Sequence, residues 1–465
     1  MKKIGVVITD GVGFRNFILS DFIEESKKVF QEVIIFSCIP ASSYEAFNFD
    51  IKIIELPEFK EKFPTWFFRK TKEVAHLQKY AKNNFGINYN LKRNYTHNHS
   101  IRGWATRFIF LLTNIFHNEK NILFYNKLQQ KTYPSYSIYN DFEDILKLNP
   151  VNILFFTHQR PPFIAPLIFL AEKLKIKTAA FIFSWDNMAS KGRMSGNFNY
   201  YLVWSNLMKK ELLHFYESIY ENQVQIVGTP QFEPYVLERY KMSEDEFHKK
   251  FDLNPALKTI CYSCGDISTS KNDELYIELI ANFIKNKQLT EFVNFLVRTS
   301  PAEDGAKRFH KLKQNFEFIK WNFPNWELAR KEHQEIWTQR IPTAEDVKDL
   351  RAILSFSFLN INVVSTMTID FMLFDKPVIY PVFGNKDNGL YNDQRFLSYA
   401  HLVNVVNTKA TFICKKENEL LEAINCILED PNQKKSQQKQ LLEMQIGAPL
   451  EGTSERIATF LHQWS

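Results

Sequence analysis

Short, almost uninterrupted apolar runs alternate with amphipathic stretches along most of the chain. Runs such as KIGVVI, EVIIFS and NILFF are rich in β-branched and aromatic side chains, and helical patterns lie between them. Strands that are apolar on both faces are typical of parallel sheets covered by helices on both sides. The pattern therefore predicts an α/β fold, with one βα series up to about residue 231 and a second series that begins near residue 257.

The two series predict two domains, in agreement with the length of the chain. A single hydrophobic core stops growing at about 250–300 residues, and this chain has 465. We expect two Rossmann-like domains that face a cleft, over residues 1–238 and 239–440, with a C-terminal helix in 441–465 that packs across the domains. Residues 55–145 hold few clean strands and mix aromatic with basic side chains, which predicts a helical insertion in the first domain.

The net charge and the cysteine content bear on the binding partners and on the cellular compartment of the protein. The net charge of +6 is evenly spread, whereas nucleic-acid-binding proteins gather basic residues on one face. Five cysteines, an odd number, argue against a disulfide framework and for a reducing compartment. No apolar stretch is long enough to span a bilayer, and the N-terminal run does not resemble a signal peptide. We expect a cytoplasmic protein with no nucleic-acid partner.

A mixed aromatic and basic motif in the predicted insertion bears on membrane contact. The motif contains Arg102, Trp104, Arg107 and Phe108. Trp and cations in this arrangement favour peripheral contact with the inner face of the membrane. The same residues also fit an ordinary core helix with extended arginine side chains.

Polar residues at the carboxyl ends of predicted strands are the first candidates for chemistry, because ligands of open parallel sheets bind there. After the first strand, two glycines favour a tight turn and the start of a helix favours an anion. An arginine in the same stretch adds a bidentate donor. The stretch predicts an acceptor-binding loop, or else a plain turn, formed by Asp10, Gly11, Gly13, Arg15 and Asn16.

Two further strand ends in the first half carry acid–base candidates. His158 follows the strand NILFF and precedes two prolines, which suits acid–base work as well as a structural role. Asp186 lies in the loop SWDNMASKG and suits either a general base for an acceptor hydroxyl or a helix cap. We therefore take Asp10, His158 and Asp186 as candidate catalytic residues, and Asn187 and Lys191 as candidate acceptor-binding residues.

The candidate donor-binding residues lie at strand ends in the second half. Small residues after the strand KTICYS allow backbone N–H groups to reach a phosphate, and the strand NFLVR ends in a cation. In NINVVSTMTID, a Ser-Thr pair opens a helix whose first turn suits a pyrophosphate, and an aspartate one turn later suits a ribose or sugar. Simple N-capping is the alternative for this pair. The set is Ser263, Gly265, Arg298, Ser365, Thr366 and Asp370.

Four motifs occur in an order that resembles a known family. They are GTPQF, VRTSP, STMTIDFMLFDKPVIY and EGTSERI, within residues 150–460. Their order resembles the bacterial surface-polysaccharide branch of GT-B glycosyltransferases, which includes the CDP-glycerol glycerophosphotransferase-like enzymes. The resemblance implies that the second domain holds the nucleotide diphosphate and the first holds the acceptor. It also matches Arg298 to a strand-end arginine, and Glu455 and Arg456 to a C-terminal S-E-R element.

The chain also departs from that family. Ser300 stands where the strand-end motif has a histidine, and SWDN replaces the W-H-G element of the glycerophosphotransferases. These departures favour sugar transfer over glycerophosphate transfer.

We therefore expect a glycosyltransferase that moves a sugar from a nucleotide-sugar to a surface glycan or to a lipid-linked acceptor. The chain contains no D-x-D motif, the carboxylate pair that commonly holds Mg²⁺ or Mn²⁺ on a diphosphate. We expect no metal and no cofactor, with helix N-termini and Arg or Lys side chains neutralising the diphosphate. Three alternatives stay open: a UDP-sugar 2-epimerase, a CDP-glycerol-type glycerophosphotransferase and a non-catalytic scaffold of polysaccharide assembly.

Overall fold

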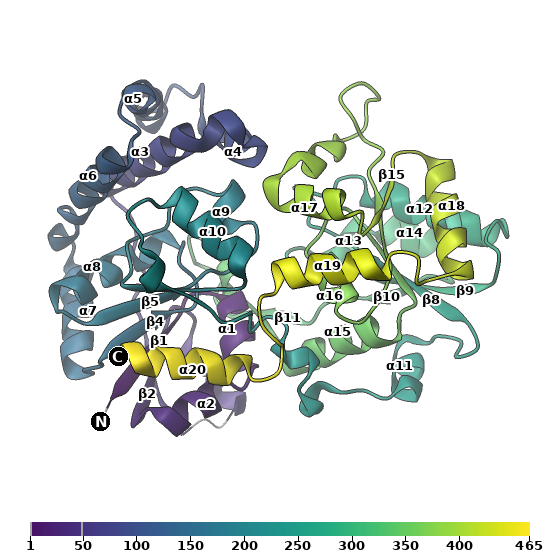
Figure 1. Ribbon diagram of the computed structural model, residues 1–465, viewed down its shortest axis with the longest axis horizontal. Helices are drawn as coiled ribbons and strands as arrows, with labels where there is room; N and C mark the ends of the chain where they lie inside the picture. Colours follow the sequence, from purple (N-terminus) through teal and green to yellow (C-terminus); the bar gives the residue numbers. More distant parts are fainter. Residues whose placement is uncertain (1, 48–49) are drawn as a thin grey trace. The chain divides into compact units, whose positions relative to one another are not determined.

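The computed structural model describes residues 2–47 and 50–465, and their backbone divides into two compact units (Figure 1). Each unit is built around its own parallel β-sheet. One segment in the second half of the sequence, Leu328–Ile341, belongs to the first unit. Unit 1 consists of Met1–Glu233, Leu328–Ile341 and Gln445–Ser465, and unit 2 consists of Pro234–Glu327 and Pro342–Met444.

The sheet of unit 1 has seven described strands, in the order β3-β2-β1-β4-β5-β6-β7, and all neighbouring strands in it are parallel. The strand order reverses between β1 and β4, and such a reversal opens a crevice beyond the carboxyl ends of the strands. The strands are β1 (Lys3–Ile8), β2 (Glu32–Ser37), β3 (Lys52–Glu55), β4 (Ile153–Phe156), β5 (Lys177–Phe181), β6 (Tyr200–Val203) and β7 (Val224–Ile226).

Helices pack against the apolar strands of this sheet. Val6 and Val7, which point to opposite faces of β1, are both fully buried, as expected for a covered parallel sheet. The C-terminal helix α20 packs on α2, where Phe30 and His462 make a ring contact of 5.3 Å. The helices are α1 (Gly11–Ile18), α2 (Phe22–Val29), α8 (Ala165–Lys173), α9 (Asn187–Ser190), α10 (Asn206–Phe215) and α20 (Thr453–Trp464).

Between β3 and β4 the described chain is helical, as the sequence predicts. This helical segment runs over residues 63–148, because β3 still occupies Lys52–Glu55. Helix α3 is its centre and contacts α4, α5 and α6. The helices are α3 (Phe63–Tyr80), α4 (Phe85–Asn94), α5 (Ile101–Ile115), α6 (Glu119–Gln130) and α7 (Ser137–Leu148).

The sheet of unit 2 has six described strands, in the order β10-β9-β8-β13-β14-β15, also with parallel pairings. Its order reverses between β8 and β13. The strands are β8 (Lys258–Ser263), β9 (Val293–Arg298), β10 (Lys320–Asn322), β13 (Leu359–Asn362), β14 (Val378–Pro381) and β15 (Phe412–Cys414), with a separate pair β11 (Trp326–Leu328) and β12 (Arg340–Pro342). The two sheets confirm the predicted α/β class.

Nine described helices accompany this second sheet. They are α11 (Glu244–Phe251), α12 (Asp273–Lys285), α13 (Gly305–Arg308), α14 (His310–Asn315), α15 (Ala344–Phe356), α16 (Met367–Met372), α17 (Ala400–Thr408), α18 (Glu417–Glu429) and α19 (Lys435–Gln445). All five cysteines are free thiols. No helix in the described ranges is both long and apolar enough to cross a membrane.

Candidate functional site

The strand reversal in unit 1 brings two of the predicted catalytic residues together. Asp10 follows β1 and His158 follows β4, and these two strands are neighbours in the sheet. Oδ2 of Asp10 lies 2.7 Å from Nδ1 of His158, and both side chains are buried. The other oxygen of Asp10 accepts hydrogen bonds from the backbone N–H groups of Val12 (3.1 Å) and Gly13 (2.8 Å), so Asp10 also caps α1.

The environment of this pair favours a neutral imidazole beside a charged carboxylate. Burial lowers the pKa of His158, and the attraction of Asp10 offsets only part of that effect. Burial acts to raise the pKa of Asp10, but His158 and the donors around the carboxylate hold it below its usual value. Neutral His158 then donates its Nδ1–H to Asp10, which leaves the lone pair on Nε2.

Nε2 of His158 is buried and has no hydrogen-bond partner among the described residues. The ring stacks on Phe183, with centroids 3.9 Å apart and planes 13° from parallel, which fixes its orientation. His158 also lines a cavity of about 370 Å³, within the size range of small-molecule sites. The other lining residues are Arg160, Pro161, Pro162, Phe183, Ser184, Asp186, Asn187, Lys191, Glu335 and Trp337.

Three of the predicted residues in the loop after β5 line the same cavity. Asp186 stands at the N-cap of α9, but its side chain makes no capping hydrogen bond. Its carboxylate instead lies 3.2 Å from Nζ of Lys191 and accepts a 3.1 Å hydrogen bond from the amide of Asn187. Asn187 in turn accepts a 2.9 Å hydrogen bond from buried Gln159. The loop therefore presents an ordered carboxylate and an ammonium group to the ligand.

Two lining residues, Glu335 and Trp337, were not found from the sequence. They lie in Leu328–Ile341, far along the chain from the βα units, and no strand-end pattern marks them. Burial raises the pKa of Glu335, while Trp337 is half exposed. Together they add a carboxyl and an aromatic face to the cavity.

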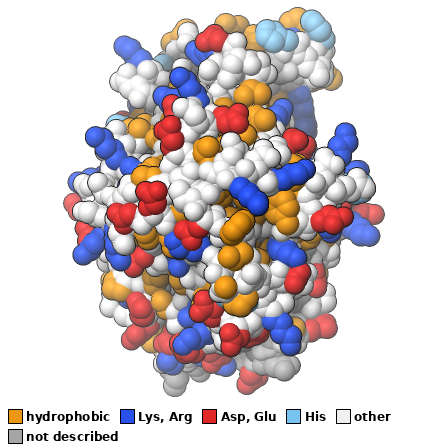
Figure 2. Space-filling model, turned by 90° about the vertical axis from the view of Figure 1, so that its right-hand side faces the viewer, with side chains coloured by type: hydrophobic (Ala, Val, Ile, Leu, Met, Phe, Trp, Pro, Cys, Tyr) orange, Lys and Arg blue, Asp and Glu red, His pale blue; other side chains and the backbone are white. Residues whose placement is uncertain are grey.

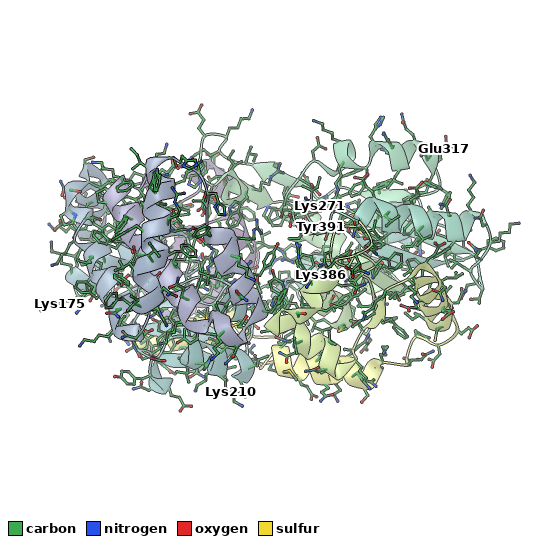
Figure 3. All side chains as sticks on the ribbon, turned by 90° about the horizontal axis from the view of Figure 1, so that it is seen from above. Lys175, Lys210, Lys271, Glu317, Lys386 and Tyr391 are labelled. Atoms are coloured by element: carbon green, nitrogen blue, oxygen red, sulfur yellow. The ribbon has the colours of Figure 1, made fainter. Side chains whose placement is uncertain are left out.

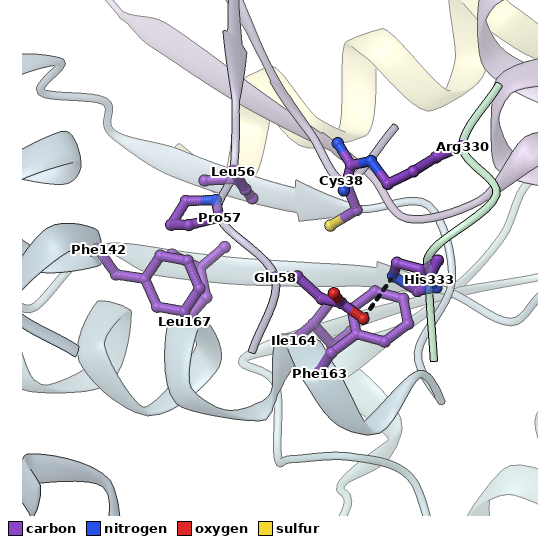
Figure 4. Close-up of a pocket in the computed structure, with 10 residues that line it drawn as sticks. All are labelled: Cys38, Leu56, Pro57, Glu58, Phe142, Phe163, Ile164, Leu167, Arg330 and His333. Carbon is purple, nitrogen blue, oxygen red and sulfur yellow. Dashed lines mark ion pairs between the residues drawn. The ribbon is translucent and has the colours of Figure 1, made fainter. Parts of the chain in front are cut away.

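Hydrogen bonds and ion pairs attach this segment to unit 1. The backbone N–H of Gln334 donates to Glu58 at 3.0 Å, and His333 lies 3.7 Å from the same carboxylate (Figure 4). A Cβ on Gly11 would lie 1.6 Å from the backbone oxygen of Arg340. Only glycine therefore permits the approach between α1 and this segment.

The remaining residues of the predicted acceptor loop do not line the cavity. Gly11 packs against the segment just described, and Gly13 packs against Thr157, whose Oγ1 would meet a Cβ at 2.6 Å. Arg15 and Asn16 are both buried. The N–H of Gly13 is taken by Asp10, so an anion-binding role for this helix start stays a prediction.

In unit 2, the predicted strand-end arginine is held inside the protein. Nη2 of Arg298 donates to both oxygens of Asp346 at 3.0 and 3.1 Å, and Nη1 donates to Asn322. Asp346 also accepts from Asn325 N (3.1 Å) and Trp326 Nε1 (2.9 Å). Burial acts to raise the pKa of Asp346, but Arg298 and these donors hold it below its usual value.

The loop after β8 is also satisfied internally. The N–H of Gly265 donates to buried Asp273 at 3.0 Å, and Oγ of Ser263 accepts a 2.8 Å hydrogen bond from Asn360. Burial raises the pKa of Asp273 to about 8. A phosphate contact from the N–H of Gly265 therefore requires its bond to Asp273 to be exchanged, whereas the hydroxyl of Ser263 accepts from Asn360 and can still donate.

The Ser-Thr pair stands at the start of α16, as predicted. The N–H of Ser365 donates to Asn362 at 2.7 Å, and its Oγ accepts from the N–H of Met367 at 3.3 Å. Thr366 is exposed and makes no capping hydrogen bond with its side chain. Val364, just before the pair, has φ of +48°. A β-branched residue in the left-handed region is strained, and such strain concentrates at functional sites.

Asp370 lies further along α16 and faces inward. Its side chain is buried and accepts a hydrogen bond from the hydroxyl of Tyr235. Its role in holding a ribose stays a prediction.

Cations gather on the loops beyond β8 and β14, at the same edge of the unit 2 sheet. Nζ of Lys271 lies 5.2 Å from the ring centroid of Tyr391, and Lys386 lies on the same loop as Tyr391 (Figure 3). Arg395 also lies over this ring, at 4.5 Å. The strand patterns did not single these residues out, because they stand several positions beyond the strand ends.

Known structures share the fold of the whole chain. MnaA of S. aureus, solved with UDP, has a TM-score of 0.55 at 10% identity and covers 100% of this chain and 97% of its own. A UDP-GlcNAc 2-epimerase of Neisseria meningitidis, bound to UDP-GlcNAc, has a TM-score of 0.54 at 10% identity and covers 100% of both chains. A glycosyltransferase of Rickettsia africae has a TM-score of 0.51 at 12% identity, covering 99% of this chain and 98% of its own.

The likeness confirms the predicted GT-B-like fold of two Rossmann-like domains. At 10–12% identity it concerns the fold alone. No protein-family model and no curated protein matches the sequence.

Proposed function

We propose that the protein is a glycosyltransferase that moves a sugar from a nucleotide-sugar to a hydroxyl of a surface glycan or lipid-linked acceptor. The observation that carries the proposal is the buried Asp10–His158 pair, in which Nε2 of His158 has no partner among the described residues and His158 lines the cavity of unit 1. An acceptor hydroxyl must lose its proton as it attacks the anomeric carbon, and a neutral imidazole held by a carboxylate is suited to take it.

The neighbouring residues suit the recognition of a sugar acceptor. Trp337 offers an apolar face for the C–H groups of a sugar ring, and Asp186 and Lys191 offer an acceptor and donors for its hydroxyls. In this proposal His158 is the base, and Asp186 positions the acceptor. Asp10 fixes the imidazole tautomer and stabilises the imidazolium that forms.

We assign the nucleotide diphosphate to the carboxyl edge of the sheet in unit 2. The start of α16 offers the hydroxyls of Ser365 and Thr366, although the N–H groups of Ser365 and Met367 are already held inside the turn. The strained Val364 supports a functional role for this turn. Lys271 and Lys386 add positive charge at the same edge. We propose that these groups neutralise the diphosphate without a metal ion.

A 2-epimerase is the second candidate, and Glu335 is the observation that favours it. An epimerase inverts one carbon of the nucleotide sugar, so it needs acid and base groups around a single ring. His158 and Asp186, which follow strands, line the cavity, and Glu335 adds a third acid–base group from a different segment.

Two measurements separate these reactions. The first is a thermal-shift screen against UDP, GDP, CDP and dTDP and their sugars, with and without Mg²⁺, in which bound nucleotide raises Tm. The second measurement incubates the selected nucleotide sugar with the protein in D₂O and identifies the products that form. A glycosyltransferase releases the nucleoside diphosphate only when a hydroxyl acceptor is added, whereas an epimerase forms a second sugar nucleotide without one. A protein that binds no nucleotide would instead be a scaffold, and the proposal would be wrong.

A further inference from the structure

Helix α5 exposes a continuous apolar stripe on the helical segment of unit 1. Its large exposed side chains recur at intervals of three and four residues, which places them on one face of the helix. The opposite face, which includes Thr106 and Ile109, is buried, and α5 packs on α3 (Figure 1). The α5 stripe consists of Ile101 (78% exposed), Trp104 (60%), Phe108 (57%), Leu111 (73%) and Ile115 (72%).

The sequence around the stripe is basic. Residues 74–118 contain six Lys and Arg residues and no Asp or Glu. One of the six, Lys79, is mostly buried and pairs with Glu217 at 2.8 Å and Glu119 at 3.8 Å, which leaves Lys82, Lys92, Arg93, Arg102 and Arg107. By contrast, the face drawn in Figure 2 carries acidic and basic side chains interspersed. Two of the cations lie over aromatic rings beside the stripe, Arg107 at 4.1 Å from the ring centroid of Trp104 and Arg102 at 5.2 Å from that of Trp66. Guanidinium groups are therefore fixed at the border of the apolar surface.

We propose that the α5 stripe docks the protein on a lipid bilayer that carries anionic headgroups. Helix α5 then lies in the plane of the membrane interface, with the stripe at the boundary between headgroups and acyl chains. Trp104 lies at headgroup depth, where tryptophan is enriched in membrane proteins. Lys82, Lys92, Arg93, Arg102 and Arg107 attract the anionic lipid. The charge complementarity selects this partner, because a second copy of the chain would bring the same positive charge to the interface.

The proposal does not depend on the reaction that the cavity catalyses. It does explain why a stripe of this size is tolerated, because exposed apolar surface of this kind otherwise promotes association. It also implies that a membrane-bound acceptor would be reached by lateral diffusion.

The test is co-sedimentation of the full chain with vesicles of phosphatidylglycerol mixed with phosphatidylcholine, and with vesicles of phosphatidylcholine alone. The stripe variant is Phe108→Ser with Leu111→Ser. The control variant is Leu148→Ser with Phe292→Ser, which removes the same side chains from positions that are 79% and 68% exposed outside the stripe. All four positions are exposed, so both variants should fold.

We expect the native chain and the control variant to sediment with the anionic vesicles, and the partition of the stripe variant to fall about tenfold or more. Added salt should weaken binding by screening the lipid charge. The proposal is wrong if the native chain stays in the supernatant, if the stripe variant still sediments fully, or if the control variant loses binding equally. It is also wrong if light scattering shows a lipid-free dimer that only the stripe variant dissociates.

Discussion

In each unit, a buried pair of polar side chains lies at the end of a strand. The two pairs differ in which of their hydrogen-bonding atoms are left without a partner. In unit 1, Asp10 binds one ring nitrogen of His158, and the other nitrogen has no partner among the described residues. In unit 2, Arg298 donates to Asp346 and Asn322, and both oxygens of Asp346 accept further hydrogen bonds. The first pair keeps a basic atom without a partner beside a cavity. In the second pair both carboxylate oxygens are engaged, and in this sense we call the pair closed.

The difference separates a reactive pair from a structural one. A buried polar atom without a partner is costly, so Nε2 of His158, whose ring lines the cavity, is a candidate for contact with a ligand. In the second pair both carboxylate oxygens of Asp346 are engaged by Arg298 and by further donors, and removing one member of the ion pair leaves a buried charge. Position at a strand end is therefore not sufficient evidence for a role in catalysis or binding.

The largest expected effect on activity follows from His158→Gln. Glutamine retains a hydrogen-bonding side chain but cannot accept a proton at pH 7, so turnover should fall about 10²- to 10⁴-fold. Nucleotide binding should stay unchanged in the thermal-shift assay. The matched control is His76→Gln, a buried histidine of α3 that does not line the cavity. Near-native turnover of His158→Gln would exclude the imidazole as the base.

The next effect concerns stability. Arg298→Met leaves the Asp346 carboxylate buried without its cation, and the free energy of unfolding of unit 2 should fall by about 3–5 kcal/mol. Urea unfolding measures this loss. The double variant Arg298→Met with Asp346→Leu removes both charges and should recover much of it.

The same variant sharpens the comparison between the two pairs. If Arg298→Met keeps its stability but loses nucleotide affinity, the arginine contacts the donor, as its sequence motif implies, and the closed pair opens on binding.

The pH profile tests the electrostatic link within the reactive pair. Because the pKa of His158 is lowered, the base form persists below the ordinary histidine value of about 6.5. We expect kcat/KM to fall only below that pH as the ring becomes protonated. Asp10→Asn removes the charge that raises the pKa of His158, so the acid limb should move to lower pH and turnover should fall. If the acid limb of the Asp10→Asn profile does not move, the group that titrates in this pH range is not His158.

Strand-end patterns predict the fold and place four of the predicted residues, His158, Asp186, Asn187 and Lys191, at the cavity of unit 1, for a local reason. The apolar runs define β1, β4 and β5, and the residues after these strands include Asp10, His158 and Asp186. The contact between Asp10 and His158 was not predicted, because it depends on which strands are neighbours in the sheet. That order is a property of the whole chain.

The residues that sequence reasoning missed depend on contacts between distant segments. Glu335 and Trp337 reach the cavity because Gln334 bonds to Glu58 and because Gly11 permits a close approach to Arg340. No local pattern encodes these contacts. In the same way, Asp346 pairs with Arg298 across 48 residues of sequence. Asp346 lies in the first turn of α15, where acidic residues are common because they interact favourably with the helix dipole, so the sequence does not distinguish it as a partner of Arg298.

The smallest expected effect concerns the cations of unit 2. Lys271 is solvent exposed, so its attraction for a diphosphate is screened, and Lys271→Met should weaken nucleotide binding only about two- to fivefold. Isothermal titration calorimetry at low salt measures the change, which should shrink as salt rises. Lys175→Met is the matched control, because Lys175 is an exposed lysine of unit 1, whereas this edge belongs to the sheet of unit 2. Equal losses in the two variants would indicate only a change in overall charge. A loss confined to Lys271→Met would support a diphosphate held by side-chain cations at this edge, and adding Mg²⁺ would then leave the affinity unchanged.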